Sequence, residues 1–285
     1  MPEPKFSNQS SESNIMTAHL NADAATGIAV VTGASAGIGA TYADRLARRG
    51  HDLILVARRQ DVLEGVAQAI RDAYGVVVET IAADLADEAD LASVASRIAG
   101  NAGITMLVNN AGIATFAPVI RTGVGAANQM IDVNVTALVR LTLAVLPGFT
   151  ESNSGTIINI SSVAALGEMP VTALYSGSKA FILSFTRGLA GELAATGVRV
   201  QAVLPGPVAT DGWDNAGLPL SSLNPATVMS VPDCVDAALG GLDTGETITL
   251  PSVEDAATLL ANYDAARFAL LGASQSGTPA SRYKE

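Results

Sequence analysis

The sequence predicts an α/β fold: a doubly wound, parallel sheet of about seven strands with helices on both faces. Short β-branched runs alternate with segments of helical spacing, which is typical of βαβ units. No proline- or glycine-rich linker interrupts this alternation, so one domain holds it. Of the 285 residues, 49% are hydrophobic, which is enough for a large buried core. A glycine-rich turn joins the first strand to the first helix, as in a nucleotide-binding α/β domain.

Seven apolar runs are the expected strands, and each is followed by a polar or glycine-containing turn. These runs are Ile28–Val31, Leu53–Val56, Val76–Ile81, Ile104–Val108, Thr156–Ile160, Val198–Leu204 and Thr247–Leu250. Helical spacing of apolar residues predicts the helices between them. The expected helices are Ile38–Arg49, Asp61–Tyr74, Glu88–Ala99, Val124–Leu146, Ala173–Ala195 and Val231–Leu239.

The remaining segments suggest three parts along the chain. Residues 1–26 are polar and lack an apolar period, so we expect a flexible arm ahead of a domain over 27–251. Within that domain, about 210–232 is long, proline-containing and aperiodic, which is typical of a lid over a substrate. Residues 252–285 predict a further helix from Val253 to about Leu271, opened by Ser252, and a frayed tail.

Composition argues against several classes of function. With 16 basic and 27 acidic residues the net charge is −11, which repels nucleic acid and anionic membrane surfaces. One cysteine and two histidines are too few for a disulfide framework or the usual metal sites, so no metal is expected. No uninterrupted apolar run reaches the roughly 18 residues of a membrane helix, and the start lacks the pattern of a secretory signal. We therefore expect a cytoplasmic protein.

The turn from Thr32 to Gly39 has the features of a phosphate site at a helix N-terminus. Orphan amides of the first helical turn attract an anion, and glycines let the backbone approach a pyrophosphate closely. Glycine triplets also arise as simple turns, but this one lies between the first expected strand and helix. The expected contacts are Gly33, Ser35, Gly37, Ile38 and Gly39.

The end of the second strand indicates which dinucleotide is bound. Folds that select NAD carry an acidic residue near this point, whereas Ala57 is followed here by Arg58 and Arg59. A guanidinium can bind a 2′-phosphate through two hydrogen bonds, so NADP(H) is expected in preference to NAD(H), with Arg58 the stronger candidate. The alternative is that both arginines form a solvated helix start.

Other polar residues follow strands whose carboxyl ends meet at the same sheet edge. Asp84, after the third strand, could accept a hydrogen bond from an adenine amino group beside Leu85, or simply cap a helix. Asn109-Asn110-Ala111-Gly112 closes the fourth strand. We expect Asp84, Leu85, Asn110, Ala111 and Gly112 to line one cofactor crevice.

Tyr175 and Lys179 form a candidate acid–base pair. They are i and i+4 on one helix face, and Lys179 is the only lysine between Lys5 and Lys284. A neighbouring ammonium is expected to lower the pKa of the phenol towards neutrality, which would make Tyr175 a general acid or base. An incidental surface pair is the alternative. Ser162 ends the fifth strand 13 residues before Tyr175, and Asn134 lies in an apolar helix as a ligand or a structural tie.

Together these residues resemble the short-chain dehydrogenase/reductase family, over Gly27 to about Leu250. The resemblance is carried by Thr-Gly-x-x-x-Gly-x-Gly at Thr32–Gly39, Asn109–Gly112, Asn134, Ser162, Tyr175-x-x-x-Lys179 and Pro205–Thr210. It implies a Rossmann-like fold of the shorter-chain branch, the NADP-preferring subgroup, and a carbonyl reductase or alcohol dehydrogenase activity. Family members are commonly homodimers or homotetramers.

The resemblance also implies a role for each site residue. Ser162 binds the substrate carbonyl oxygen, Tyr175 delivers its proton, and Lys179 lowers the tyrosine pKa and binds ribose hydroxyls. Asn134 holds a water that connects Lys179 to solvent. The adjacent Ser161 could take the place of Ser162. The nicotinamide is expected near the segment after the sixth strand, at Pro205, Gly206, Val208 and Thr210.

The expected substrate is a small, mainly apolar carbonyl compound or alcohol. Val163, Met169 and Trp213 are candidate pocket walls, with core or ordered-loop positions as the equal alternative, and no basic cluster in the lid indicates an anionic thioester. A competing hypothesis is a regulatory or scaffold protein that binds NADP(H) without turnover. A serine hydrolase is disfavoured because neither His19 nor His51 can lie beside Ser162.

Overall fold

The computed structural model describes residues 26–167 and 170–283, and it divides the chain into two compact units, Met1–Pro251 and Ser252–Glu285. The arm expected over residues 1–26 therefore lies, except for Thr26, outside the described residues.

The first unit is built on one sheet, which confirms the predicted fold class. In the described residues the sheet has seven strands, all parallel, in the order β3-β2-β1-β4-β5-β6-β7. The strands are β1 (Ile28–Thr32), β2 (Asp52–Ala57), β3 (Val78–Ala82), β4 (Ile104–Asn109), β5 (Gly155–Ile160), β6 (Val198–Val203) and β7 (Ile248–Thr249). The order reverses between β1 and β4, which is where such sheets open a ligand crevice.

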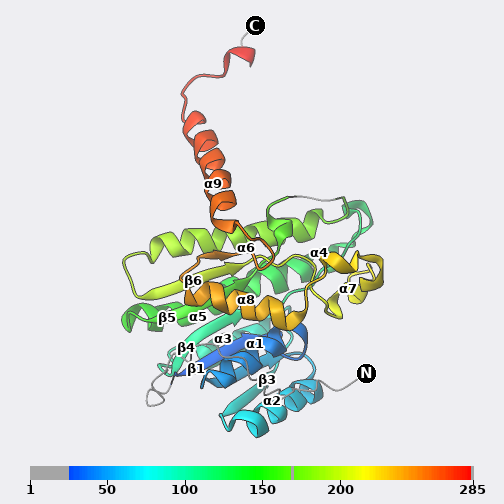
Figure 1. Cartoon of the computed structure of the whole chain (residues 1–285), viewed down its shortest axis with the longest axis vertical. Helices are drawn as coiled ribbons and strands as arrows, with labels where there is room; N and C mark the ends of the chain where they lie inside the picture. The colour runs from blue at the N-terminus through cyan, green and yellow to red at the C-terminus, as the bar shows by residue number, and fades with distance from the viewer. Residues whose placement is uncertain (1–25, 168–169, 284–285) are drawn as a thin grey trace. The chain divides into compact units, whose positions relative to one another are not determined.

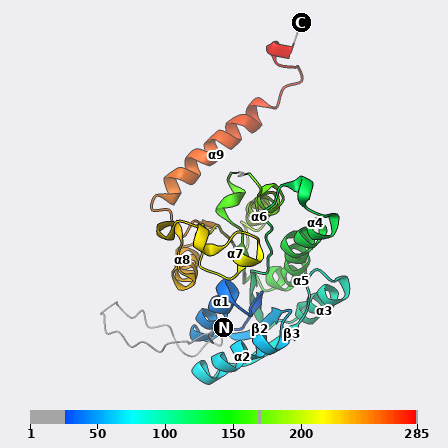
Figure 2. The ribbon, with the colours of Figure 1, turned by 90° about the vertical axis from the view of Figure 1, so that its right-hand side faces the viewer.

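Helices cover both faces of this sheet (Figures 1 and 2). One core, under α1, α2 and α8, contains Leu46, Leu63 and Val235, and the other, under α3, α5 and α6, contains Leu141 and Leu189. The helices are α1 (Gly37–Arg48), α2 (Gln60–Tyr74), α3 (Glu88–Ile98), α4 (Val124–Ile131), α5 (Ala137–Glu151), α6 (Ala173–Glu192), α7 (Gly212–Asn215), α8 (Val231–Asp243) and α9 (Ala256–Ala273). Burial of both sheet faces explains why the strands read as continuous apolar runs.

Local sequence signals explain several helix ends. Helix α2 ends at Gly75, which adopts the left-handed conformation that glycine tolerates best (φ +68°). Helix α3 begins at Asp87, whose carboxylate accepts hydrogen bonds from the backbone N–H groups of Ala89 and Asp90. The hydroxyl of Ser230 accepts from Asp233 in the same way and opens α8.

A buried ladder of polar side chains ties the central strands to the helices that carry the site. The Asn109 amide on β4 donates to the Thr142 hydroxyl on α5 (3.1 Å) and to the Asn159 Oδ1 on β5 (2.9 Å). Asn159 in turn donates to the Thr186 hydroxyl on α6 (2.9 Å). Buried hydrogen bonds of this kind are costly to break, so they fix α6 against the sheet.

Several predicted helices differ from the observed ones. Helix α6 ends at Glu192 rather than Ala195, and α8 runs to Asp243 rather than Leu239. Two further differences concern how a helix begins or continues. The single helix predicted over Val124–Leu146 is divided by a π-helical segment, Asp132–Thr136, and extends to Glu151. This π-helical segment contains Asn134, whose side chain hydrogen-bonds the Ile113 backbone, and apolar periodicity cannot reveal either feature. The last helix starts at Ala256 rather than Val253, because Asp255 and not Ser252 is its cap and accepts from the Thr258 N–H.

Helix α4, the π-helical segment and α5 together span Val124–Glu151 and contain an 18-residue window with a mean hydropathy of 1.5, so by length and composition alone this stretch could cross a membrane. Its side chains Ala137, Leu141, Val145 and Phe149 belong to the core on the α3 and α6 side of the sheet. A core helix of a folded domain passes the same test.

The second unit contains α9, an 18-residue helix in which no residue is buried within that unit. Leu259, Phe268 and Leu270 are all more than half exposed. The Arg267 guanidinium donates to the Asp264 carboxylate at 2.9 Å. Residues 252–285 thus supply little core of their own.

Candidate active site

The glycine-rich turn has a conformation that other residues would not adopt without strain. Gly33 and Gly37 have positive φ angles of +66° and +54°. A β-carbon on Gly39 would lie 2.3 Å from the Gly33 carbonyl oxygen and 2.4 Å from Nδ2 of Asn110. The turn therefore leaves the amides at the start of α1 open to a ligand, as a phosphate site requires.

Hydrogen bonds that involve Thr32 and Asn110 stabilise the glycine-rich turn. The Thr32 hydroxyl accepts hydrogen bonds from the backbone N–H groups of Asn110 and Ala111, both at 3.0 Å. The Asn110 side-chain amide donates to the carbonyl oxygens of Thr32 (2.9 Å) and Gly33 (3.3 Å). Asn110 thus positions the turn, a role that its sequence motif alone did not reveal.

Replacing Gly39 by alanine is expected to lower the free energy of unfolding by about 1–3 kcal/mol, because the new methyl group meets backbone at 2.3 Å. Gly65 on α2 is the matched control, since a β-carbon there meets nothing within 4 Å. Gly65→Ala should raise stability by about 0.5–1 kcal/mol. Denaturant unfolding of both variants measures their free energies of unfolding. If the two substitutions changed this quantity equally, the close packing inferred around Gly39 would be wrong.

Beside the turn, Arg58 and Arg59 follow β2 directly, and both are exposed. Arg59 is the residue before the first turn of α2. Their position fits the predicted 2′-phosphate site and equally fits a solvated helix start. Ser35 and Ile38 are half-buried in the turn, so both predicted contacts remain accessible.

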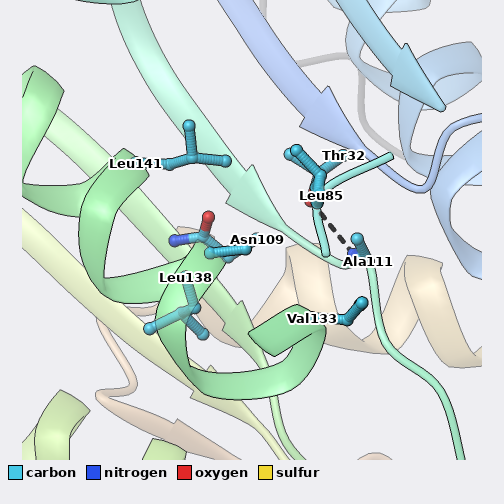
Figure 3. Close-up of a pocket in the computed structure, with 8 residues that line it drawn as sticks. Thr32, Leu85, Asn109, Ala111, Val133, Leu138 and Leu141 are labelled. Atoms are coloured by element: carbon cyan, nitrogen blue, oxygen red, sulfur yellow. Dashed lines mark hydrogen bonds between the residues drawn. The ribbon is translucent and has the colours of Figure 1, made fainter. Parts of the chain in front are cut away.

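Two of the residues predicted to line the cofactor crevice, Leu85 and Ala111, border a hollow at the ends of β1 and β4, whereas Asp84, Asn110 and Gly112 do not (Figure 3). Leu85, Ala111 and Val133 line it, and it is too small to admit a water molecule. Asp84 lies just outside, and its carboxylate accepts from the Ala86 N–H at 3.1 Å. Asp84 therefore caps a turn here, while Asp87 caps α3.

Tyr175 and Ser162 lie close together near the carboxyl end of β5. Tyr175 lies in the first turn of α6, and Ser162 follows β5. The Ser162 side chain lies beside the Tyr175 phenol, accepts from the Ala164 N–H (3.2 Å) and donates to the Pro205 carbonyl (3.5 Å). The neighbouring Ser161 is buried and donates to the Lys179 carbonyl at 2.8 Å, so only Ser162 faces the phenol.

Lys179 is buried beneath the tyrosine. Its Nζ lies 5.6 Å from the centre of the Tyr175 ring and donates to the Ile160 carbonyl at 2.9 Å. Burial lowers the pKa of the Lys179 ammonium to about 8. The amine can therefore change its protonation state near physiological pH.

The structure corrects the expected titration of Tyr175. Burial raises the pKa of the phenol above its ordinary value, and the hydrogen bond from Ser162 opposes this only in part. The expected lowering towards neutrality is wrong for this structure, because desolvation of the phenolate is the dominant effect. At neutral pH Tyr175 is protonated, which is the form that donates a proton.

Asn134 lies in the π-helical segment and clamps the loop after β4. Its side chain accepts from the Ile113 N–H (2.8 Å), donates to the Ile113 carbonyl (2.9 Å), and donates to the Ser178 hydroxyl (3.0 Å). This is the structural tie that the sequence left open. A β-carbon on Gly112 would be 3.4 Å from both Asn134 Oδ1 and Lys179 Nζ, so these two groups flank the same space.

The segment after β6 reaches the same edge. The Pro205 carbonyl accepts from the Val163 N–H at 3.0 Å, and Gly206 follows it towards Val208, which is buried. Thr210 lies against the glycine turn, since a β-carbon on Gly37 would be 3.2 Å from its methyl group. These residues therefore bridge the phosphate turn and the catalytic cluster.

Of the predicted pocket walls, Trp213 and Val163 are half-buried at this end of the molecule, and Met169 lies outside the described residues. The structure adds Phe116, in the loop after β4, whose ring packs edge-on against Tyr175 with centroids 5.8 Å apart. Sequence reasoning missed Phe116. Its one signal was an aromatic residue four positions beyond Asn109–Gly112 in a chain with only 4% aromatic residues.

Comparison with known proteins gives consistent matches. The family model described as short chain dehydrogenase matches residues 27–218. A very-long-chain 3-oxoacyl-CoA reductase from Anas platyrhynchos is 42% identical over 189 residues, which cover 64% of this chain and 60% of that protein. An uncharacterized oxidoreductase from Staphylococcus saprophyticus is 40% identical over 184 residues, covering 64% and 79%. The chain thus spans about 60% of the length of several of these relatives.

Solved structures match over more of the chain. A short-chain dehydrogenase from Sphingobium yanoikuyae in complex with NADPH has a TM-score of 0.87 and 43% identity, covering 90% of this chain and all of that one. A bulky-bulky ketone specific alcohol dehydrogenase from Comamonas testosteroni has a TM-score of 0.84 and 35% identity, covering 92% and 100%.

Proposed function

The chain belongs to the short-chain dehydrogenase family, and from this premise we propose that it is an NADP(H)-dependent oxidoreductase that interconverts an apolar ketone or aldehyde with its alcohol. The observation that carries the proposal is the Tyr175 phenol beside Ser162, with the buried Lys179 ammonium 5.6 Å from the centre of its ring. Loss of NADPH absorbance with a panel of ketones and aldehydes tests it. NADPH binding without turnover of any carbonyl compound would instead favour a regulatory binding protein.

The residues present fit a nicotinamide dinucleotide. The glycine turn offers free amides where a pyrophosphate would lie, and the space beside Gly112 is bounded by the Asn134 amide and the Lys179 amine. Hydroxyl groups of a ribose are suitable partners for both of these groups. When bound, the cofactor supplies the hydride. Side chains of the protein supply the proton and stabilise the group that has donated it.

The side chains have separable roles in the reduction. Tyr175, protonated at neutral pH, donates a proton to the carbonyl oxygen, and Ser162 hydrogen-bonds the same oxygen and holds it in place. The Lys179 ammonium stabilises the tyrosinate that forms. The hydrogen bonds between Asn134 and the Ile113 backbone hold the loop after β4 in place beside the site. In the oxidation direction the tyrosinate accepts the alcohol proton.

Arg58 supports the preference for NADP(H). It is exposed beside the glycine turn, and the similar Sphingobium protein is described in complex with NADPH. Arg58→Asp should lower the ratio of kcat/KM for NADPH to that for NADH by roughly 10–100-fold, since a charge-assisted contact is replaced by repulsion. Arg59→Asp is the comparison and should have the smaller effect. An unchanged ratio in the Arg58 variant would contradict the proposed preference.

The charges around the site support a neutral substrate. From Pro205 to Pro232 the chain carries no basic residue, and Asp211 and Asp214 are both exposed. An acidic entrance disfavours the phosphates of a coenzyme A thioester, the substrate that the names of several relatives specify. A bulky apolar ketone, as named for the similar Comamonas protein, fits this lid better.

The proposal also covers the oligomeric state of the protein and its location in the cell. We expect a homo-oligomer, because Leu143 on α5 is 58% exposed and Ile131 on α4 is 38% exposed on otherwise apolar helices. The acidic net charge of −11 supports a cytoplasmic protein that acts on small molecules rather than on nucleic acid or membranes.

A further inference from the structure

We propose that Phe116 and Trp213 form one aromatic wall that selects ketones bearing an aryl group next to the carbonyl. This inference rests on the proposed function and adds a substrate class to it. The two rings come from distant parts of the chain, and they stack with centroids 5.5 Å apart and an interplanar angle of 28°.

The wall is fixed to the backbone at both ends. The Phe116 N–H donates to the Ala216 carbonyl at 3.0 Å, which joins the loop after β4 to the lid. The Trp213 indole N–H donates to the Val208 carbonyl at 2.8 Å. The indole therefore has no free polar group to offer a ligand, and what the two rings present is an apolar, polarizable surface.

The wall also touches the catalytic phenol. The Phe116 ring packs edge-on against Tyr175, with an interplanar angle of 78°. A carbonyl oxygen that accepts a proton from Tyr175 must lie about 2.6–3.2 Å from its hydroxyl. We expect one substituent of that carbonyl to lie beside the Phe116 ring, which borders the Tyr175 ring. The aromatic wall is therefore expected to contact the group bonded directly to the reacting carbon.

An aryl substituent gains most from this surface. Flat rings pack against aromatic side chains by stacking or edge contacts, which contribute beyond area burial, and a saturated ring of similar size cannot reproduce that contact. The wall itself carries no charge, and the Lys179 ammonium near the Tyr175 ring is buried and donates to the Ile160 carbonyl, so we expect the wall to offer nothing to an anionic substituent. The nearest charges along the lid, Asp211 and Asp214, are acidic and repel such a group.

The experiment compares acetophenone with cyclohexyl methyl ketone, which differ in the aromaticity of the ring. The measured quantity is the ratio of their kcat/KM values with NADPH, taken in each variant relative to the wild type, so that intrinsic reactivity cancels. Phe116→Leu and Trp213→Leu should each lower this ratio about fivefold, which corresponds to the loss of one aromatic contact. Phe116→Tyr, which keeps the ring, should retain the wild-type ratio.

The control is Phe181→Leu, because the Phe181 ring on α6 stacks on Phe185 rather than on Tyr175. It should leave the ratio unchanged, and NADPH binding by fluorescence confirms that each variant is folded. If the wild type reduces both ketones and the Phe116 and Trp213 variants keep its ratio, the wall is not the selecting element. If the wild type reduces no carbonyl compound, the proposed function itself is wrong, which is a different result.

Discussion

Replacing Tyr175 with phenylalanine is expected to lower kcat for ketone reduction about 10³-fold while NADPH still binds. The Tyr175 phenol lies beside the Ser162 hydroxyl, and its raised pKa keeps it protonated at neutral pH. A positioned general acid contributes about 10²–10⁴-fold to rate, so its removal is the most damaging single change in the site. Stopped-flow or steady-state loss of NADPH absorbance measures the effect.

The matched control is Tyr263→Phe on α9, which removes the same hydroxyl from the second unit and should leave kcat within about twofold of the wild type. NADPH affinity should be similar in both variants, because the glycine turn is unchanged. A Tyr175→Phe protein that reduces ketones at a near-normal rate would show that another group supplies the proton.

Lys179→Met is expected to abolish most activity and also to change how stability depends on pH. The pKa of Lys179 in the folded protein is about 8, below the ordinary value of 10.5 for an exposed lysine. Between these two values the unfolded chain binds more protons than the folded one, so the free energy of unfolding rises with pH in this window. Below pH 8 the buried ammonium opposes folding, and above pH 10.5 this penalty has been removed.

From pH 7.5 to 9.5 this group alone should raise the wild-type free energy of unfolding by about 2 kcal/mol. Lys179→Met lacks the titration, so its free energy of unfolding should change by that much less over the same interval. Denaturant unfolding at several pH values measures both proteins, and the difference between their free energies of unfolding cancels the contributions that the two proteins share. Parallel pH profiles for the two proteins would mean that Lys179 is not buried as a titrating amine.

The fold could be predicted from the sequence because its strands are buried on both faces. Such strands appear as uninterrupted apolar runs, and the parallel order follows from the helices between them. The π-helical segment at Asp132–Thr136 could not be predicted, because it depends on how Asn134 bonds to Ile113 across the site. The start of α9 was misjudged for a related reason: both Ser252 and Asp255 can cap a helix, and only the structure shows which does.

The candidate site was predictable where one residue type is required. At position 39 only glycine fits, because a β-carbon there would meet the Gly33 carbonyl. The four-residue spacing of Tyr175 and Lys179 places both on one face of α6, and this spacing can be seen in the sequence. The direction of the Tyr175 pKa shift was not predictable, because it depends on how deeply the phenol is buried rather than on which residues are its neighbours. Phe116 was missed because its contact with Tyr175 joins the loop after β4 to α6, two segments that are distant in sequence.

The central claim is that Tyr175 and Ser162 act together on one carbonyl oxygen beside a nicotinamide. A crystal structure of the protein with oxidised cofactor and an unreactive ketone tests this most directly. The account predicts that the ketone oxygen lies within about 2.6–3.2 Å of both hydroxyl oxygens, with the cofactor seated on the glycine turn. A ketone bound elsewhere, or a phenol turned away from the cofactor, would contradict it.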